Sequence, residues 1–136
     1  GFSFGSLIAM QLLMRRPEIN RFIAISPQPN VYDFTFLSPC PTSGLVVHGN
    51  KDELVPIEYI NELDKRLSSQ KGIKVEFQSV SDANHFFSKN EISLTKYLNK
   101  YIKKETAVYW KFLFNVPPVE DSIQPVVDGK EIGKFK

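Results

Sequence analysis

The sequence has little of several features that would assign its class at once. Its 136 residues include one cysteine, Cys40, so no disulfide can form within the chain and a reducing compartment, the cytoplasm, is expected. The formal net charge of +2 is too small to indicate a nucleic-acid partner. No apolar run approaches the roughly 20 residues that span a bilayer, and no secretory signal is recognised.

Histidine is equally scarce. His48 and His85 are the two in the chain, and neither has a second ligand at a metal-binding spacing, so we expect no metal site. An organic cofactor is not implied either. Cys40 lies in a proline-rich stretch, 38–41, without a neighbouring histidine. A thiol nucleophile there is not expected.

What is present is ordinary globular composition, 42% hydrophobic and 24% charged, at a length that suits one domain. Apolar runs at strand length alternate with patterns at helical spacing, which indicates an α/β fold with a parallel sheet. The first helix is apolar on nearly every side and is expected to be buried all round. The predicted elements are a helix over 6–16, strands over 21–26 and 44–48, a helix from Pro56 to near Gly72, a strand over 74–80 and a helix that a capping box opens at Ser88–Glu91.

The character of the sequence changes near residue 105. We therefore predict an α/β domain over 1–104 and a divergent tail over 105–136, which holds an aromatic run at 109–114 and a hairpin-like segment at 126–132 around an Asp-Gly turn. Three interpretations of the tail stay open: an added β element, a partner-binding arm, or sequence without settled structure.

The strongest local signal is Gly1–Gly5, a Gly-x-Ser-x-Gly pentapeptide followed at once by the apolar helix. This pattern is typical of a nucleophile elbow, a sharp strand-to-helix turn that exposes a serine hydroxyl. We expect the two glycines to be needed because side chains two positions either side of Ser3 would clash.

A serine hydroxyl needs a base to take its proton, and a histidine is the residue type for this. His85 follows the last predicted strand, where the catalytic groups of open α/β sheets gather. His48 sits within an apolar strand and is expected to be a packed core residue.

The imidazole in turn needs a carboxylate to fix its tautomer. Asp52 follows a buried strand and is favoured over Glu53, its neighbour, and over Asp82, which can cap a local turn. The order Ser3, Asp52, His85 is the chain order of α/β-hydrolases and differs from that of chymotrypsin and subtilisin.

These motifs resemble the α/β-hydrolases, most closely the compact bacterial enzymes of the dienelactone-hydrolase-like and prolyl-peptidase-like groups. The matching segments are Gly1–Gly5, His48–Pro56 and Ala83–Phe87. The resemblance implies that Ser3 is the nucleophile, Asp52 the triad acid and His85 the general base, with the backbone N–H of Phe4 as an oxyanion donor. It implies a serine hydrolase that cleaves an ester, thioester or amide.

The resemblance also implies the C-terminal half of an α/β-hydrolase sheet with flanking helices, the upstream strands missing. The loop that gives this family its second oxyanion N–H belongs to the upstream half, so activity is expected of the full-length parent. Asn50 stands where many relatives carry an aspartate that is not the triad acid. A non-catalytic fragment or split-gene remnant is the alternative from another class, and an acyltransferase would use the same triad.

The segment 27–42 is too short for a helical cap over the site, which is therefore expected to be open. Its aromatic residues Tyr32, Phe34 and Phe36 are candidate contacts for an acyl or leaving group. Covering the edge of the sheet is an equally good interpretation of these three rings. The oligomeric state is not indicated.

Overall fold

The fold was taken from a computed structural model, which describes the backbone of residues 1–114 and the side chains of residues 1–107. The chain divides into two compact units, Gly1–Asn90 and Glu91–Lys136, which are considered separately. The described elements are α1 (Phe4–Arg15), β1 (Phe22–Ile25), the 3-10 turn η1 (Thr35–Leu37), β2 (Gly44–Gly49), α2 (Ile57–Ser68), β3 (Val75–Val80) and α3 (Glu91–Phe114).

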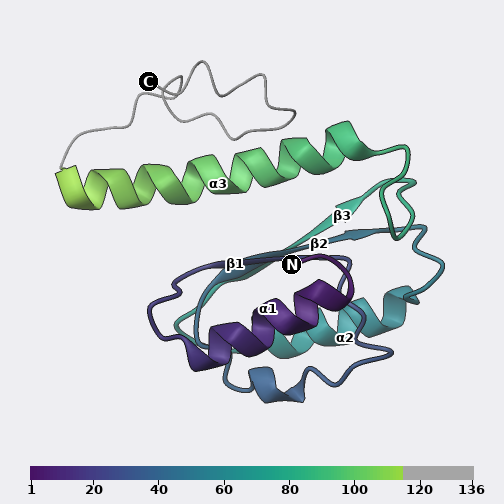
Figure 1. Ribbon diagram of the computed structural model, residues 1–136, viewed down its shortest axis with the longest axis horizontal. Helices are drawn as coiled ribbons and strands as arrows, with labels where there is room; N and C mark the ends of the chain where they lie inside the picture. The colour runs from purple at the N-terminus through teal and green to yellow at the C-terminus, as the bar shows by residue number, and fades with distance from the viewer. Residues whose placement is uncertain (115–136) are drawn as a thin grey trace. The chain divides into compact units, whose positions relative to one another are not determined.

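The first unit is built on a parallel sheet in the order β1-β2-β3 (Figure 1). The register places Ala24 beside Val46 and Val46 beside Phe77, so these three side chains share one face. β2 is the central strand and all of its residues are buried, as the unbroken apolar run predicted. The predicted α/β fold with a parallel sheet is confirmed.

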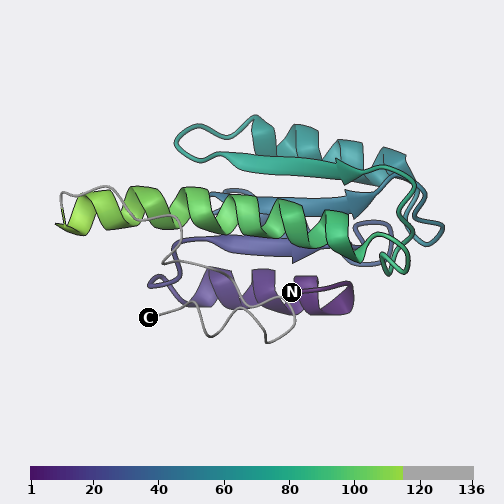
Figure 2. The same ribbon diagram turned by 90° about the horizontal axis from the view of Figure 1, so that it is seen from above.

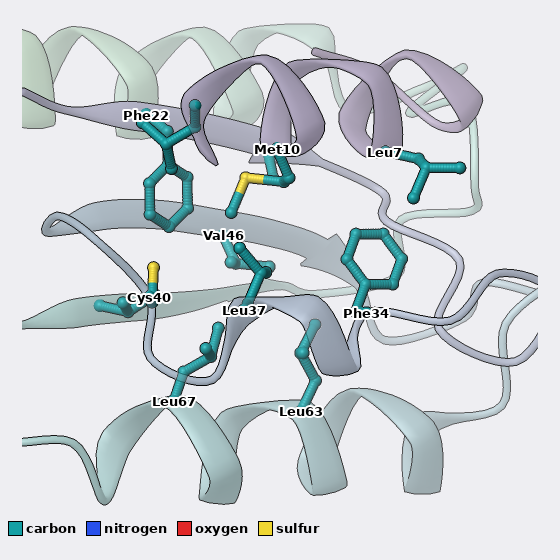
Figure 3. Packing of buried hydrophobic residues seen from close by; sticks show 12 residues of the cluster. Leu7, Met10, Phe22, Phe34, Leu37, Cys40, Val46, Leu63 and Leu67 are labelled. Carbon is teal, nitrogen blue, oxygen red and sulfur yellow. The ribbon is translucent and has the colours of Figure 1, made fainter. Parts of the chain in front are cut away.

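Helices α1 and α2 lie on the same face of the sheet (Figure 1), with α1 near β1 and α2 near β3 (Figure 2). Between them and the strands lies the hydrophobic core (Figure 3). The segment around η1 closes this core between the two helices. The cluster comprises Leu7, Met10, Leu13, Phe22, Ala24, Phe34, Leu37, Cys40, Val46, Leu63, Leu67 and Val75.

Helix α1 differs from its prediction. Leu7, Met10 and Leu13 point into the core, at the i, i+3, i+6 spacing of one helix face. Ile8 and Leu12 are about half exposed. The helix is therefore buried on the face that meets the sheet and not all round, because one sheet face can cover only one side of a helix in the described unit.

The chain before α1 runs alongside β1 and pairs with it through a single bridge. Phe2 pairs with Ile25 in a parallel bridge, and the N–H of Ser3 donates to the carbonyl of Ile25 at 2.8 Å. A Cβ on Gly1 would meet the carbonyl oxygen of Gly5 at 2.2 Å, so glycine is required there. A Cβ on Gly5 would meet no atom within 4 Å, so the predicted clash is found at Gly1 and not at Gly5.

The loops that follow β2 and β3 are joined by backbone contacts. The N–H of Asn50 donates to the carbonyl of Val80 and that of Lys51 to the carbonyl of Ala83, at 3.1 and 3.0 Å. Gly49 lies so close to the second loop that a Cβ on it would be 2.2 Å from the carbonyl oxygen of Ala83. Glycine at this position lets the two loops approach.

The second unit begins with α3, whose start at Glu91 agrees with the prediction. Ser88 does not form the predicted capping box at this start: the N–H and hydroxyl of Ser88 are bonded to the side chain of Asn84. α3 continues through residue 105, where the tail was predicted to begin, and the hairpin predicted at 126–132 lies outside the described residues.

Among the described helices, none is long and apolar enough to cross a membrane.

Gly49→Ala should destabilise the fold, because the added methyl group cannot avoid the backbone of Ala83. Overpacking of this kind costs about 1–3 kcal/mol, which urea unfolding followed by circular dichroism would measure. Gly5→Ala is the matched control, since its methyl group meets open space and alanine favours a helix. Equal unfolding midpoints for Gly49→Ala and the unmodified protein would contradict this account.

Candidate active site

Ser3 sits at the sharp turn between the bridge residue Phe2 and α1. Its backbone has φ 54° and ψ −120°, a conformation that is strained for a residue with a Cβ. The turn is held from both sides: the N–H of Ser3 bonds β1, and its carbonyl accepts both the N–H and the hydroxyl of Ser6. Ser6 is fully buried. A paired extended residue, a strained serine and a helix thus follow one another, in the order that a nucleophile elbow requires.

The structure brings the three predicted residues into one hydrogen-bonded chain. Ser3 Oγ lies 2.8 Å from His85 Nε2, and His85 Nδ1 lies 2.7 Å from Asp52 Oδ2. The histidine and aspartate side chains are 3% and 5% exposed. An ionised Asp52 accepts only, so the proton belongs on Nδ1 of a neutral His85, and Nε2 then faces the serine hydroxyl as an acceptor.

The turn after β2 orients the carboxylate. Asp52 Oδ1 accepts the backbone N–H groups of Leu54 and Val55 at 2.8 and 3.0 Å, which leaves Oδ2 for the histidine. The two rival acids lie elsewhere: Glu53 is exposed, and Asp82 forms an exposed ion pair with Lys51 at 2.9 Å. Of the three candidate acids, Asp52 is the one in contact with His85.

The loop after β3 is equally well fixed around His85. Ala83 and Phe87 are buried on either side of the histidine. Between them, Asn84 Oδ1 accepts the N–H groups of Phe86 and Ser88 at 3.1 Å each, an Asx turn. The imidazole ring also contacts the ring of Phe86 edge-on, with centroids 5.0 Å apart. Few backbone torsions are left free to move the imidazole.

The sequence interpretation missed Ser26. This residue is 0% exposed, has φ 50°, and follows β1 directly. Its N–H donates to the carbonyl of Val47 and its hydroxyl donates to the carbonyl of His85 at 2.7 Å. Because the preceding residue, Ile25, accepts the N–H of Ser3, two consecutive residues connect the serine turn to the histidine loop. Its place at a strand's carboxyl end was the signal that could have found it.

The three aromatic residues predicted to contact substrate are placed differently from one another. Phe34 is 3% exposed and packs in the hydrophobic core, so its ring does not line the site. Phe36 stacks on Phe34 and packs against the same core. Tyr32 contacts the ring of Phe4, next to Ser3, with centroids 5.4 Å apart. Phe86, which the sequence interpretation did not select, is 61% exposed beside His85.

Phe4 is the first residue of α1. A helix leaves the N–H groups of its first turn without intrahelical acceptors, so the N–H of Phe4 has no acceptor within the helix. It directly follows the nucleophile candidate, and the partial positive charge of a helix N-terminus favours an anion there. The position suits the predicted oxyanion donor.

The remaining candidate ligands among the described residues are Cys40 and His48. In the described part of the chain, no three residues of His, Cys, Asp or Glu type come together as they would around an ion. Cys40 is buried and its thiol donates to the carbonyl of Thr42, while burial raises the pKa of the thiol. Both observations agree with an unreactive cysteine.

His48 is a core residue, as expected. It lies in β2 and its Nδ1 is buried without a hydrogen-bond partner in the described structure. Burial lowers the pKa of His48 below its ordinary value, against the smaller opposing effects of a hydrogen bond with Gly49 and of the negative charges of Asp52 and Asp64. Burial therefore favours the neutral form of His48 in the folded protein.

A parallel sheet flanked by helices, with serine at the turn into α1 and with aspartate and histidine on the loops after β2 and β3, is typical of the α/β-hydrolase fold. The model of the dienelactone hydrolase family matches residues 1–116. The chain belongs to this family.

Three individual proteins are similar to the chain. An uncharacterised protein of Rickettsia prowazekii, RP471, is 46% identical over 106 residues, 75% of this chain and 44% of its own. The crystal structure of ATU1826 from Agrobacterium tumefaciens, an α/β-hydrolase candidate of unknown function, is 42% identical with a TM-score of 0.74, and the match covers 88% of this chain and 52% of ATU1826. An α/β serine hydrolase homologue from Coxiella burnetii is 32% identical with a TM-score of 0.60, and the match covers 69% of this chain and 43% of the homologue. The chain thus spans about half the length of these relatives.

Ser26→Ala should lower stability more than loss of an ordinary surface hydroxyl. The substitution leaves the buried carbonyl of His85 without its donor, which costs about 1–3 kcal/mol of unfolding free energy. Ser68→Ala removes an exposed hydroxyl bond to Asp64 and should change stability by no more than about 0.5 kcal/mol. Chemical denaturation would compare the two variants, and similar effects would contradict the importance of the Ser26 bond.

The burial of His48 predicts a specific pH dependence of stability. The unfolded chain binds a proton at His48 near its ordinary pKa of 6.5, whereas the folded protein, whose pKa is lower, does not. The free energy of unfolding is therefore highest above pH 6.5, and it decreases as the pH falls through 6.5 toward the pKa of His48 in the folded protein. Thermal midpoints between pH 7.5 and 5 should drop less in His48→Gln than in the unmodified protein. Parallel curves for the two proteins would contradict the assignment.

Proposed function

We propose that the full-length protein is a serine hydrolase that cleaves an ester, thioester or amide through an acyl-enzyme. The observation that carries the proposal is the continuous chain of contacts from Ser3 Oγ through His85 to Asp52, at 2.8 and 2.7 Å. Both distances are those of good hydrogen bonds, and both end on buried groups shielded from competing water.

In the acylation step, Ser3 Oγ attacks the carbonyl carbon of the substrate while His85 Nε2 takes its proton. Asp52 holds Nδ1–H and stabilises the imidazolium that forms. When the tetrahedral intermediate collapses, His85 returns the proton to the leaving oxygen, sulfur or nitrogen. Water then attacks the acyl-serine with the same assistance and releases the acid.

The oxyanion of the tetrahedral intermediate would accept the N–H of Phe4, at the first turn of α1. A second donor would come from the part of the full-length protein that corresponds to the unmatched half of the relatives. Removal of one such donor typically slows an enzyme about 10²- to 10³-fold. We therefore assign activity to the full-length protein.

Membership of the dienelactone hydrolase family supports a small-molecule substrate with an acyl bond. Tyr32 beside Phe4 and the exposed ring of Phe86 beside His85 offer apolar surface on two sides of the nucleophile. We propose these rings as contacts for the acyl or leaving group. The chemistry written above needs no metal ion or organic cofactor.

Ser3→Ala in the full-length protein should abolish covalent labelling by a fluorophosphonate, because such probes phosphonylate an activated serine. Labelling is read by in-gel fluorescence and by the mass of the modified protein. Ser68→Ala, an exposed serine at the end of α2, is the matched control and should label like the unmodified protein. Undiminished labelling of Ser3→Ala would refute the proposal, and unlabelled native protein would favour the non-catalytic alternative.

A further inference from the structure

The loop after β1 brings another polar side chain to the nucleophile. Gln28 Oε1 lies 3.2 Å from Ser3 Oγ, while His85 Nε2 lies 2.8 Å from the same atom. Gln28 is not part of the Ser-His-Asp chain, and its carboxamide carries no charge at any ordinary pH. The nucleophile therefore has two hydrogen-bonding neighbours, of which the triad accounts for one.

The loop that carries Gln28 is well fixed. The backbone carbonyl of Gln28 accepts the N–H groups of Val31 and Tyr32 at 3.0 and 2.9 Å, and the preceding residue, Pro27, is fully buried. Farther along, Asn30 Nδ2 donates to the carbonyl of Leu54 at 2.9 Å, which ties this loop to the loop of the triad acid. The carboxamide of Gln28 is thus presented to Ser3 from a scaffold that is joined to the rest of the site.

The two neighbours compete for one proton. A serine hydroxyl has a single hydrogen to donate and two lone pairs that accept. With Gln28 Oε1 toward it, that hydrogen can go to the glutamine or to His85 Nε2. The last torsion of a glutamine is broad and nearly two-fold, so a turn of the carboxamide places Nε2 at the same position. Its N–H then donates to a lone pair of Oγ, and the hydroxyl proton is directed to His85.

We infer that Gln28 is a further catalytic residue, whose carboxamide holds Ser3 Oγ in line with His85 during proton transfer. The inference rests on the proposed role of Ser3 as nucleophile. A neutral amide suits this task because its N–H supports the alkoxide character that develops on Oγ. A carboxylate at the same place would compete with His85 for the proton and would oppose the growing negative charge.

Two substitutions in the full-length protein separate these effects. Gln28→Met keeps the length of the side chain and removes the amide. It should slow fluorophosphonate inactivation and kcat for p-nitrophenyl acetate about 3- to 10-fold, with KM unchanged, as expected for loss of one hydrogen bond to the reacting atom. Gln28→Glu keeps the shape of the side chain and adds a negative charge. Both rates should be lower in Gln28→Glu than in Gln28→Met.

The pH dependence of kcat/KM distinguishes a direct contact of Gln28 with the reacting serine from a purely structural role of Gln28. The acid limb of kcat/KM reports protonation of the free enzyme's general base, and a carboxylate introduced next to Ser3 favours the protonated form of that base. Gln28→Glu should therefore shift that limb upward by about one pH unit, whereas Gln28→Met should leave it in place. The titratable groups already facing this region are Asp52 on Nδ1 of His85 and His48, which senses the charge of Asp52; Lys51 and Asp82 form their exposed ion pair on the adjoining loops.

The matched controls are Gln11→Met and Gln11→Glu on the exposed side of α1, which should retain the rate and the pH profile of the unmodified protein. Normal thermal midpoints of the Gln28 variants show that they fold. Rates within twofold of the unmodified protein together with an unmoved acid limb in Gln28→Glu would overturn the inference while leaving the role of Ser3 intact. Labelling that persists in Ser3→Ala would instead overturn the proposed function and this inference with it.

Discussion

The parallel pairing of the strands is the constraint on which the site depends. Because β1, β2 and β3 run in one direction, the loops that follow them emerge at one edge of the sheet, next to the turn at Ser3. Asp52 and His85 are 33 residues apart, and His85 is 82 residues from Ser3. A slip of one residue in the register of a strand would move its side chains to the other face and would displace the loop that follows it.

Backbone contacts between the loops convert this common edge into a fixed geometry. Gly49 lets the loop after β2 approach Ala83, and the hydroxyl of Ser26 ties the loop after β3 to the end of β1. Buried carbonyl groups need donors, so these bonds stabilise the fold and position the imidazole together. The cost of moving His85 would therefore include the loss of bonds that the folded chain needs.

The sequence predicted the regular elements well where a single signal was strong. β2, with its unbroken apolar run, and α2, with Ile60, Leu63 and Leu67 on one face, appear where they were expected. The burial of α1 was overestimated because an apolar sequence shows which side chains can be buried. It does not show which other elements of the fold are present to cover them. Phe34 illustrates the same limit, since an aromatic residue in a loop can face a ligand or the core with an identical sequence.

The sequence alone determined the class of fold, the Gly-x-Ser-x-Gly turn and the order of the three candidate catalytic residues. These features could be predicted because helix and strand propensities and the ends of strands depend on residues that are neighbours in the sequence. Only the tertiary structure decided which acid meets His85, that glycine is sterically required at Gly1 and Gly49, and that Ser26 and Gln28 reach the site. Those outcomes depend on distances of a few ångströms between segments far apart in the chain. Such distances follow from the packing of the sheet and its loops, which no local pattern encodes.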